Sequence, residues 1–316
     1  MRRAALSDAG LRRDGNQDVA FAGCRLLVVA DGFGLDGARA AAAAVGALTP
    51  LEDDGVPAAD PLGALSGAVD RAGRAVDEVA GSSADPDGVG TTLTALLWTG
   101  SRLALAHVGD TRAHLLRDGL LTRLTDDHSM VRELTDAGRL TPEEALAHPQ
   151  RALLTKALTR NVRITPDTVD VRALDVRSGD RYLLCSDGLW AAVPEAGISR
   201  VLSTTADPRE AVRSLVDLAN AAGGPDNVSC VVADFGDRTS QGQLEPCRVP
   251  PVPGGSGRRR SAKGNGVGRG PDVSTHPCGR GCATGRDRSG GSSSARTDGA
   301  SRVVTCGGRG GVRERQ

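Results

Sequence analysis

Three aspartates of this 316-residue chain share one setting, in which a carboxylate stands beside a glycine at the edge of an apolar, strand-like run. They are Asp31 after residues 26–30, Asp187 after residues 181–185, and Asp226 before residues 228–235. Carboxylates at strand ends lie on loops that a rigid sheet holds in place, so several can converge. Converging carboxylates repel one another unless a hard cation neutralises them, and Mg²⁺ and Mn²⁺ prefer such oxygen ligands. The pattern therefore predicts a divalent-metal site.

An Asp-Gly pair is also the commonest chemistry of a tight turn, and each pair taken singly is better explained as a turn. Asp118-Gly119 lies between two strand-like runs and is typical of a two-residue hairpin. The metal hypothesis therefore depends on the joint pattern and on no single pair.

Short apolar runs predict the strands that must position these carboxylates, and helical stretches are grouped between them. The predicted strands are 25–30, 91–98, 102–108, 112–117, 120–124, 169–174, 181–185 and 228–235. The predicted helices are 38–48, 62–79, 131–158 and 208–221. Runs of strands with helices grouped between them indicate layered α+β architecture.

The zero net charge of the chain conceals two unlike regions. Residues 1–236 carry 24 basic and 33 acidic side chains, whereas residues 237–316 carry 15 basic and 6 acidic ones and no aromatic residue. A Gly-, Arg- and Ser-rich segment without aromatic residues cannot bury enough apolar surface to offset its ordering entropy. We therefore expect one globular domain over 1–236 and a disordered Gly/Arg/Pro-rich tail over 237–316.

Two hypotheses for the tail stay open: it arises from a shifted reading frame or a degenerate extension, or it is a basic linker that binds acidic partners or nucleic acid electrostatically. The neutral chain as a whole argues against a general nucleic-acid binder. No apolar run is long enough to span a bilayer, and the first residues carry no apolar signal segment. We expect a cytoplasmic monomer without a membrane partner.

Seven short motifs follow one another between about residue 4 and residue 236. They are SD with RDGNQD (7–8 and 13–18), VADGFG (29–34), GTT (90–92), HVGDTR (107–112), DHS (127–129), CSDGL (185–189) and DNV (226–228). Each motif is weak alone, but seven in this order resemble the metal-dependent protein serine/threonine phosphatases of the 2C type, in their bacterial form.

That resemblance implies a four-layer α-β-β-α sandwich, in which two central antiparallel sheets are flanked by helices. It also implies hydrolysis of phosphoserine and phosphothreonine in proteins by a hydroxide that bridges two Mn²⁺ or Mg²⁺ ions. No Ser or Cys nucleophile is then required. The implied partners are phosphorylated proteins, the products of serine/threonine kinases.

The resemblance also assigns a role to each site residue. Asp31 bridges both metals, Gly32 offers its carbonyl, Asp187 and Asp226 complete the shell of the second ion, Asp18 acts through water, Asp110 helps hold a third ion, and Arg13 clamps the substrate phosphate. An alternative for Arg13 is a surface ion pair with Asp14 or Asp18, in which case Arg12 could take the phosphate.

The chain departs from the family pattern at four positions. Gln17 replaces a common Glu, and Thr159 replaces a Gly. Leu35 and Asp36 replace a Gly and a His in the loop that follows Asp31, and that His has been proposed to assist the leaving group. These last two departures motivate a competing hypothesis, a catalytically weakened phosphoprotein-binding regulatory module of the same fold.

Overall fold

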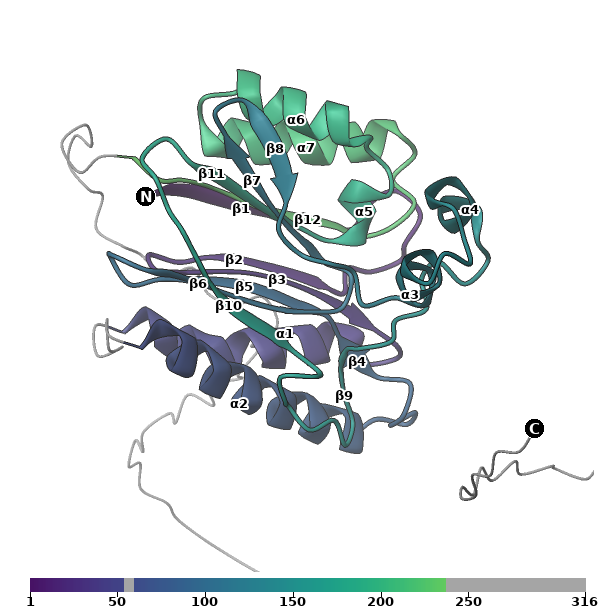
Figure 1. Ribbon diagram of the computed structural model, residues 1–316. Coiled ribbons are helices and arrows are strands. Elements are labelled where there is room, and N and C mark those ends of the chain that lie inside the picture. The colour runs from purple at the N-terminus through teal and green to yellow at the C-terminus, as the bar shows by residue number, and fades with distance from the viewer. Residues whose placement is uncertain (54–59, 237–316) are drawn as a thin grey trace, which may run out of the picture. The chain divides into compact units, whose positions relative to one another are not determined.

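Two antiparallel sheets lie face to face in the computed structural model, which describes residues 1–53 and 60–236 (Figure 1). The first sheet has the order β1 (Arg2–Asp8), β12 (Val228–Asp234), β11 (Arg181–Cys185), β7 (Arg112–Arg117), β8 (Leu120–Arg123). The second has the order β10 (Asp170–Leu174), β6 (Leu103–Val108), β5 (Leu93–Trp98), β3 (Leu26–Phe33), β4 (Gly90–Thr91), β9 (Leu158–Thr159), and β2 (Asp18–Ala22) pairs with β3.

Helices cover the outer face of each sheet, so the expected four-layer sandwich is confirmed. The second sheet is covered by α1 (Gly37–Leu48), the short 3-10 helix η1 (Thr49–Glu52) and α2 (Pro61–Gly81), and the first by α6 (Glu195–Thr204) and α7 (Pro208–Ala221) (Figure 1). The smaller helices α3 (Met130–Asp136), α4 (Pro142–Ala147) and α5 (Asp187–Trp190) lie toward one end.

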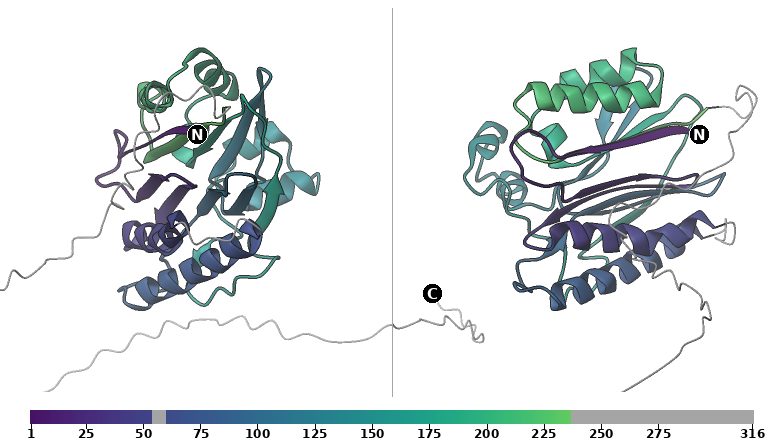
Figure 2. Two further views of the ribbon diagram at one scale, coloured as in Figure 1. Left: turned by 90° about the vertical axis from the view of Figure 1, so that its left-hand side faces the viewer. Right: turned by 180° about the vertical axis from the view of Figure 1, so that it is seen from behind.

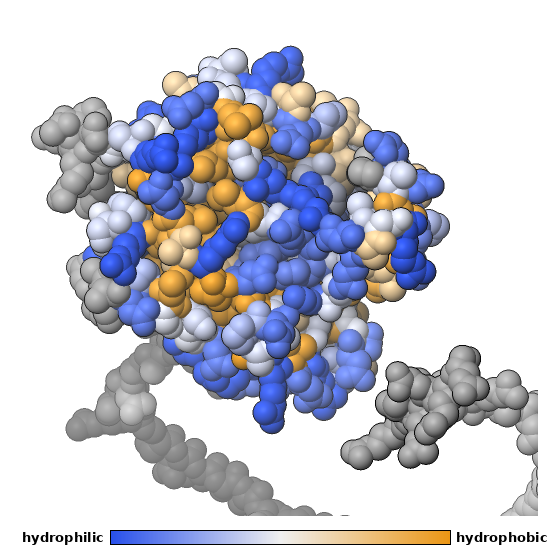
Figure 3. All heavy atoms as spheres, viewed as in Figure 1, coloured by the Kyte–Doolittle hydropathy of each residue, from blue (hydrophilic) through white to orange (hydrophobic). Residues whose placement is uncertain are grey.

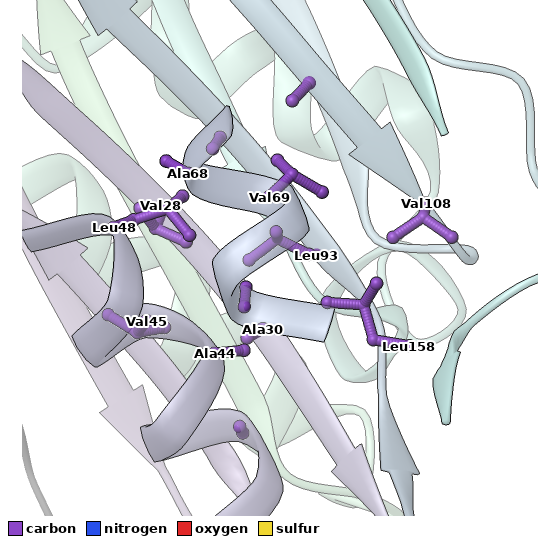
Figure 4. Close-up of a cluster of buried hydrophobic side chains, with 14 of the residues drawn as sticks. Val28, Ala30, Ala44, Val45, Leu48, Ala68, Val69, Leu93, Val108 and Leu158 are labelled. Atoms are coloured by element: carbon purple, nitrogen blue, oxygen red, sulfur yellow. The ribbon is translucent and has the colours of Figure 1, made fainter. Parts of the chain in front are cut away.

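The apolar run of β3 is continuous rather than alternating because both faces of the strand are buried. Val28 and Ala30 pack under α1 and α2, where Val45 and Val69 meet them (Figure 4). The intervening Val29 points the other way, into the layer between the sheets. A strand buried on both faces needs apolar residues at every position.

Helix α2 shows how an amphipathic sequence fixes its own placement. The Asp60 carboxylate caps the helix by accepting from the Gly63 amide at 2.8 Å, and Pro61 occupies its first position. Its apolar face, which includes Leu65 and Val69, is fully buried. Hydrophilic side chains line the opposite, outer edge of the molecule over α2 (Figure 3).

The predicted helix over 131–158 is wrong. The helix ends at Asp136 because Gly138 adopts a positive φ of 67°, and a second helix begins at a Thr141 capping box. The second helix ends at Ala147. The next residue, His148, precedes Pro149, and a residue before proline is disfavoured in the helical conformation. The chain then runs in an irregular path to β9.

The elements that were not predicted include β1, β2, η1, β9, α5 and α6, whereas the Asp118-Gly119 hairpin is confirmed, with positive φ at both residues. Asp31 lies within β3 instead of on a loop after it. The predicted tail over 237–316 lies outside the described residues. Within the described ranges, no helix has both the length and the apolar character needed to cross a bilayer.

Candidate metal centre and active-site cleft

Asp18 and Asp31 face each other directly across the β2–β3 pair. Like charges opposite one another destabilise a sheet, so this pair indicates a site under functional constraint. The backbone of Asp31 is held by the GTT motif, since its amide donates to Thr92 Oγ1 at 3.0 Å and its carbonyl accepts from Thr91 Oγ1 at 3.0 Å. The strand pairing and the threonines together fix the backbone position from which the Asp31 side chain extends.

The buried Asp18 carboxylate is only half satisfied. Its Oδ2 accepts from Ser186 Oγ at 2.7 Å, whereas its buried Oδ1 has no hydrogen-bond partner among the described residues. Burial raises the pKa of Asp18 to about 7, and the neighbouring Asp187 adds to the rise. An orphaned carboxylate oxygen of this kind suits a site that receives a water molecule or a cation.

Two further carboxylates reach the same place from other strands. Asp110 follows β6, and burial, with Asp187 as the next cause, raises its pKa to about 8. Asp187 is the first residue of α5, directly after β11, and its pKa is raised by burial and then by Asp226. The pKa of Asp31 is raised well above its usual range by burial, Asp18, Asp187 and Asp110. These residues are therefore electrostatic neighbours, and we call them the carboxylate cluster: Asp18, Asp31, Asp110, Asp187 and Asp226.

The donor set fits a hard divalent cation. It consists of carboxylate oxygens, one of them unpaired, that repel one another until a cation compensates them. Within the described residues, no three acidic, His or Cys side chains already surround one point in ligand geometry. The Asp226 carboxylate pairs with the Arg13 guanidinium instead, so it is not turned toward the other carboxylates.

Arg13 forms that ion pair, with Nη2 at 2.6 Å from Asp226 Oδ2. The hydrogen bond that Arg13 donates to Asp226 is the main cause that raises the pKa of Arg13, and Asp187 and Asp31 contribute. The alternative pairing with Asp14 or Asp18 is not the one observed. The side chain of Arg13 stays 55% exposed, so it can exchange its carboxylate partner for another anion.

A cleft of about 870 Å³ joins the carboxylates to the surface. Six of the seven predicted site residues line it, namely Arg13, Asp31, Gly32, Asp110, Asp187 and Asp226. Asp18 does not line the cleft and faces Asp31 across the strand pair. The lining also includes residues 152–157, and none of the seven sequence motifs covers that segment.

The two departures at Leu35 and Asp36 leave the carboxylates intact. Asp36 pairs with Arg39 at 2.9 Å and is not part of the cleft lining, and Leu35 is 68% exposed. Gln17, the third departure, ties this loop to the site because its Nε2 donates to the Gly34 carbonyl at 2.8 Å. Leu35 and Asp36 therefore lie outside the cleft lining, whereas Gln17 and Thr159, the other two departures, are part of it.

The raised pKa values predict that the metal-free domain loses stability as the pH rises. A carboxyl group whose folded pKa is raised contributes stability below its unfolded pKa near 4, and that contribution is lost as the pH passes the folded pKa. For Asp18 and Asp110 the loss begins near pH 4 and is complete just above about pH 7 and about pH 8 respectively, so its last part falls above about pH 6.5. We expect Tm in EDTA to drop by about 5 °C or more between about pH 6.5 and pH 9.

Saturating Mn²⁺ is the matched condition for this scan, since a bound cation favours the ionised carboxylates and removes the drop. The buried His107 and His114, whose pKa values burial lowers to about 4, act in the opposite direction and only below about pH 6.5. A metal-free Tm that is flat or rises over the same interval would contradict the carboxylate cluster.

Comparison with known proteins agrees with this geometry. Residues 8–223 match the family model described as protein phosphatase 2C. The serine/threonine protein phosphatase PstP of Mycobacterium tuberculosis is 45% identical over 256 residues, covering 80% of this chain and 48% of that protein. The chain thus spans about half the length of this relative.

Solved structures extend the likeness to three dimensions. The crystal structure of the Mycobacterium tuberculosis phosphatase PstP/Ppp has 46% identity and a TM-score of 0.69, covering 75% of this chain and 99% of that one. The catalytic domain of PstP in complex with two manganese ions has 44% identity and a TM-score of 0.67, covering 75% and 98%. The family model spans well over half of the sequence, and the chain belongs to the protein phosphatase 2C family.

Proposed function

We propose that this chain hydrolyses phosphoserine and phosphothreonine in proteins with the help of divalent metal ions. The observation that carries the proposal is the convergence of Asp31, Asp110, Asp187 and Asp226 with Arg13 in one open cleft. Carboxylates can hold cations, and a guanidinium can hold a phosphate, so the cleft combines the two requirements of phosphate-ester hydrolysis.

We assign two ions, Mn²⁺ or Mg²⁺, to the carboxylate cluster. Asp31, Asp187 and Asp226 would hold these ions through their carboxylates, and Gly32 would hold one through its carbonyl. Asp18 acts through water, and Asp110 belongs to a third, weaker position. Such ions lower the pKa of water and neutralise charge on phosphoryl oxygens, so that water attacks at neutral pH.

The protein's own groups then have three tasks. Arg13 releases Asp226 and donates two hydrogen bonds to phosphate oxygens, because the guanidinium fork matches both carboxylate and phosphate. Asp226, once released, is free to face the cations. With cations bound, the buried carboxylates Asp18 and Asp110 would be ionised and would supply negative charge that needs no reorganisation during the reaction.

The partners that follow are phosphorylated proteins made by serine/threonine kinases. A cleft of about 870 Å³ has room for a phosphorylated side chain and part of its peptide. Monomeric state, cytoplasmic location and the lack of nucleic-acid and membrane partners remain predictions from the sequence.

The competing proposal, a phosphoprotein-binding module with weakened catalysis, rests on Leu35 and Asp36. A single experiment separates the two, in which the full chain with Mn²⁺ is given a phosphothreonine peptide. Release of inorganic phosphate over many turnovers supports the enzyme. Saturable peptide binding without phosphate release would support the binding module and overturn the enzyme.

A further inference from the structure

The loop that carries Arg13 connects two strands of different sheets. It leaves β1 after Asp8 in the first sheet and enters β2 at Asp18 in the second (Figure 2, right). Neither sheet alone can therefore fix the course of residues 9–17. Most of the side chains in this loop are exposed, so packing alone does not fix it either, and specific hydrogen bonds must set the position of Arg13.

A single buried side chain supplies three of those bonds. The Asn227 amide nitrogen donates to the carbonyls of Ala9 at 3.0 Å and Gly15 at 2.8 Å. The Asn227 amide oxygen accepts from the Gln17 backbone N–H at 2.9 Å. Both amide hydrogens and one oxygen lone pair are thus committed to the loop, on both sides of Arg13.

The same segment, residues 224–227, supports the loop by backbone contacts. The Leu11 amide donates to the Gly224 carbonyl at 2.9 Å. Gly10 has a φ of +72°, and a Cβ there would lie 2.1 Å from the Asp226 carbonyl oxygen. The loop therefore lies directly on the residues that precede β12.

This arrangement gives one short segment control over two functional groups. Asp226 offers its carboxylate to the cleft, and the adjacent Asn227 holds the loop whose Arg13 reaches that carboxylate at 2.6 Å. Asn227 is 7% exposed although it borders the cleft, so removing its side chain would leave the three loop groups without these partners. A change at Asn227 would therefore displace Arg13 relative to the carboxylates.

We propose that Asn227 is a positioning residue that fixes the 9–17 loop and thereby presents Arg13 to the phosphate, a role that rests on the function proposed above. Asn227 itself needs no contact with substrate, because its amide hydrogens are used by Ala9 and Gly15. A displacement of about 1 Å in such a group can reduce turnover by about 100-fold.

Amide hydrogen exchange in the metal-free protein tests the structural half of the proposal. In Asn227→Ala, the Gln17 amide loses its acceptor, so we expect its exchange to be at least about 10-fold faster. The amides of β12 should keep their protection, which reports that the fold is intact. Asn220→Ala is the matched control, because the Asn220 amide makes one bond to Asp8 at 3.2 Å and none to residues 9–17 among the described contacts.

A double-mutant cycle with Arg13→Ala tests the functional half. We expect Asn227→Ala to lower kcat/KM for a phosphothreonine peptide by about 30-fold alone, but by less than about 3-fold when Arg13 is already Ala. Asn220→Ala should change kcat/KM by less than about 2-fold in both backgrounds. Should Asn227→Ala not fold, Asn227→Ser passes through the same cycle.

Each outcome either supports or overturns the positioning role of Asn227. Faster Gln17 exchange together with non-additive kinetics supports the positioning role. Equal losses of kcat/KM in both backgrounds, or an unchanged Gln17 amide, overturn it while phosphate release by the unaltered chain leaves the proposed function standing. If the unaltered chain releases no phosphate, the proposed function fails, and the role of Asn227 fails with it.

Discussion

Asp31→Asn is expected to lower kcat by about 10³-fold or more, because it removes the charge at the centre of the carboxylate cluster while keeping the shape of the side chain. Asp31 faces Asp18 across the β2–β3 pair, and its pKa is raised by Asp18, Asp187 and Asp110 together. Steady-state phosphate release with saturating Mn²⁺ measures the loss.

The same substitution should stabilise the metal-free protein. Removing one of several mutually repelling, buried charges relieves both repulsion and desolvation, so Tm in EDTA rises above that of the unaltered chain at about pH 8. The further rise in Tm on adding Mn²⁺ should shrink, because binding to the folded state is the source of that rise. Activity and metal-free stability thus move in opposite directions.

Asp118→Asn is the matched control, with the same chemical change at an exposed hairpin turn. Asn tolerates the left-handed backbone of Asp118, whose φ is 52°, as well as Asp does. Its kcat and its response to Mn²⁺ should equal those of the unaltered chain within about 2-fold. Near-normal turnover in Asp31→Asn would show that the cluster is not the catalytic site.

Arg13→Ala is the second large effect, and we expect kcat/KM for a phosphothreonine peptide to fall by about 100-fold. The guanidinium is the group in the cleft that already pairs with an anionic oxygen, at 2.6 Å from Asp226. Mn²⁺ affinity should stay equal or increase, because Asp226 is released from the ion pair. Isothermal titration with Mn²⁺ and peptide kinetics on the same preparation measure both quantities.

Arg12→Ala is the comparison that decides between the two neighbouring arginines. Both line the cleft, but among the described residues only Arg13 makes an ion pair with a carboxylate of the cluster. We expect Arg12→Ala to change kcat/KM by less than about 3-fold. A larger loss in Arg12→Ala than in Arg13→Ala would transfer the phosphate-binding role to Arg12.

The sheets could be predicted where the sequence pattern is strong. Residues 25–30 and 181–185 are apolar throughout or nearly so, and both became buried central strands. The strands β1 and β2 were missed because RRAALSD and DVAFA mix polar and small residues, and only pairing with β12 and β3 makes them strands. Tertiary contact decided these elements, which local propensity could not reveal.

The candidate site was predictable in its members but not in its contacts. Asp31 and Asp187 each precede a glycine next to an apolar run, and Asp226 follows Gly223-Gly224-Pro225, so that local signal can be read from the chain. The Arg13–Asp226 pair joins residues 213 positions apart, and Asn227 reaches back to the loop over a similar separation. No periodicity or turn signal marks such a contact, so the structure was needed to find it.

Metal dependence of phosphate release tests the central claim most directly. The full chain is freed of metal with EDTA, dialysed, and assayed on one phosphothreonine peptide with Mn²⁺ added or with EDTA retained. The carboxylate cluster predicts turnover with Mn²⁺, a rate lower by about 10³-fold or more in EDTA, and recovery when Mn²⁺ is restored. Full activity in EDTA would contradict the account.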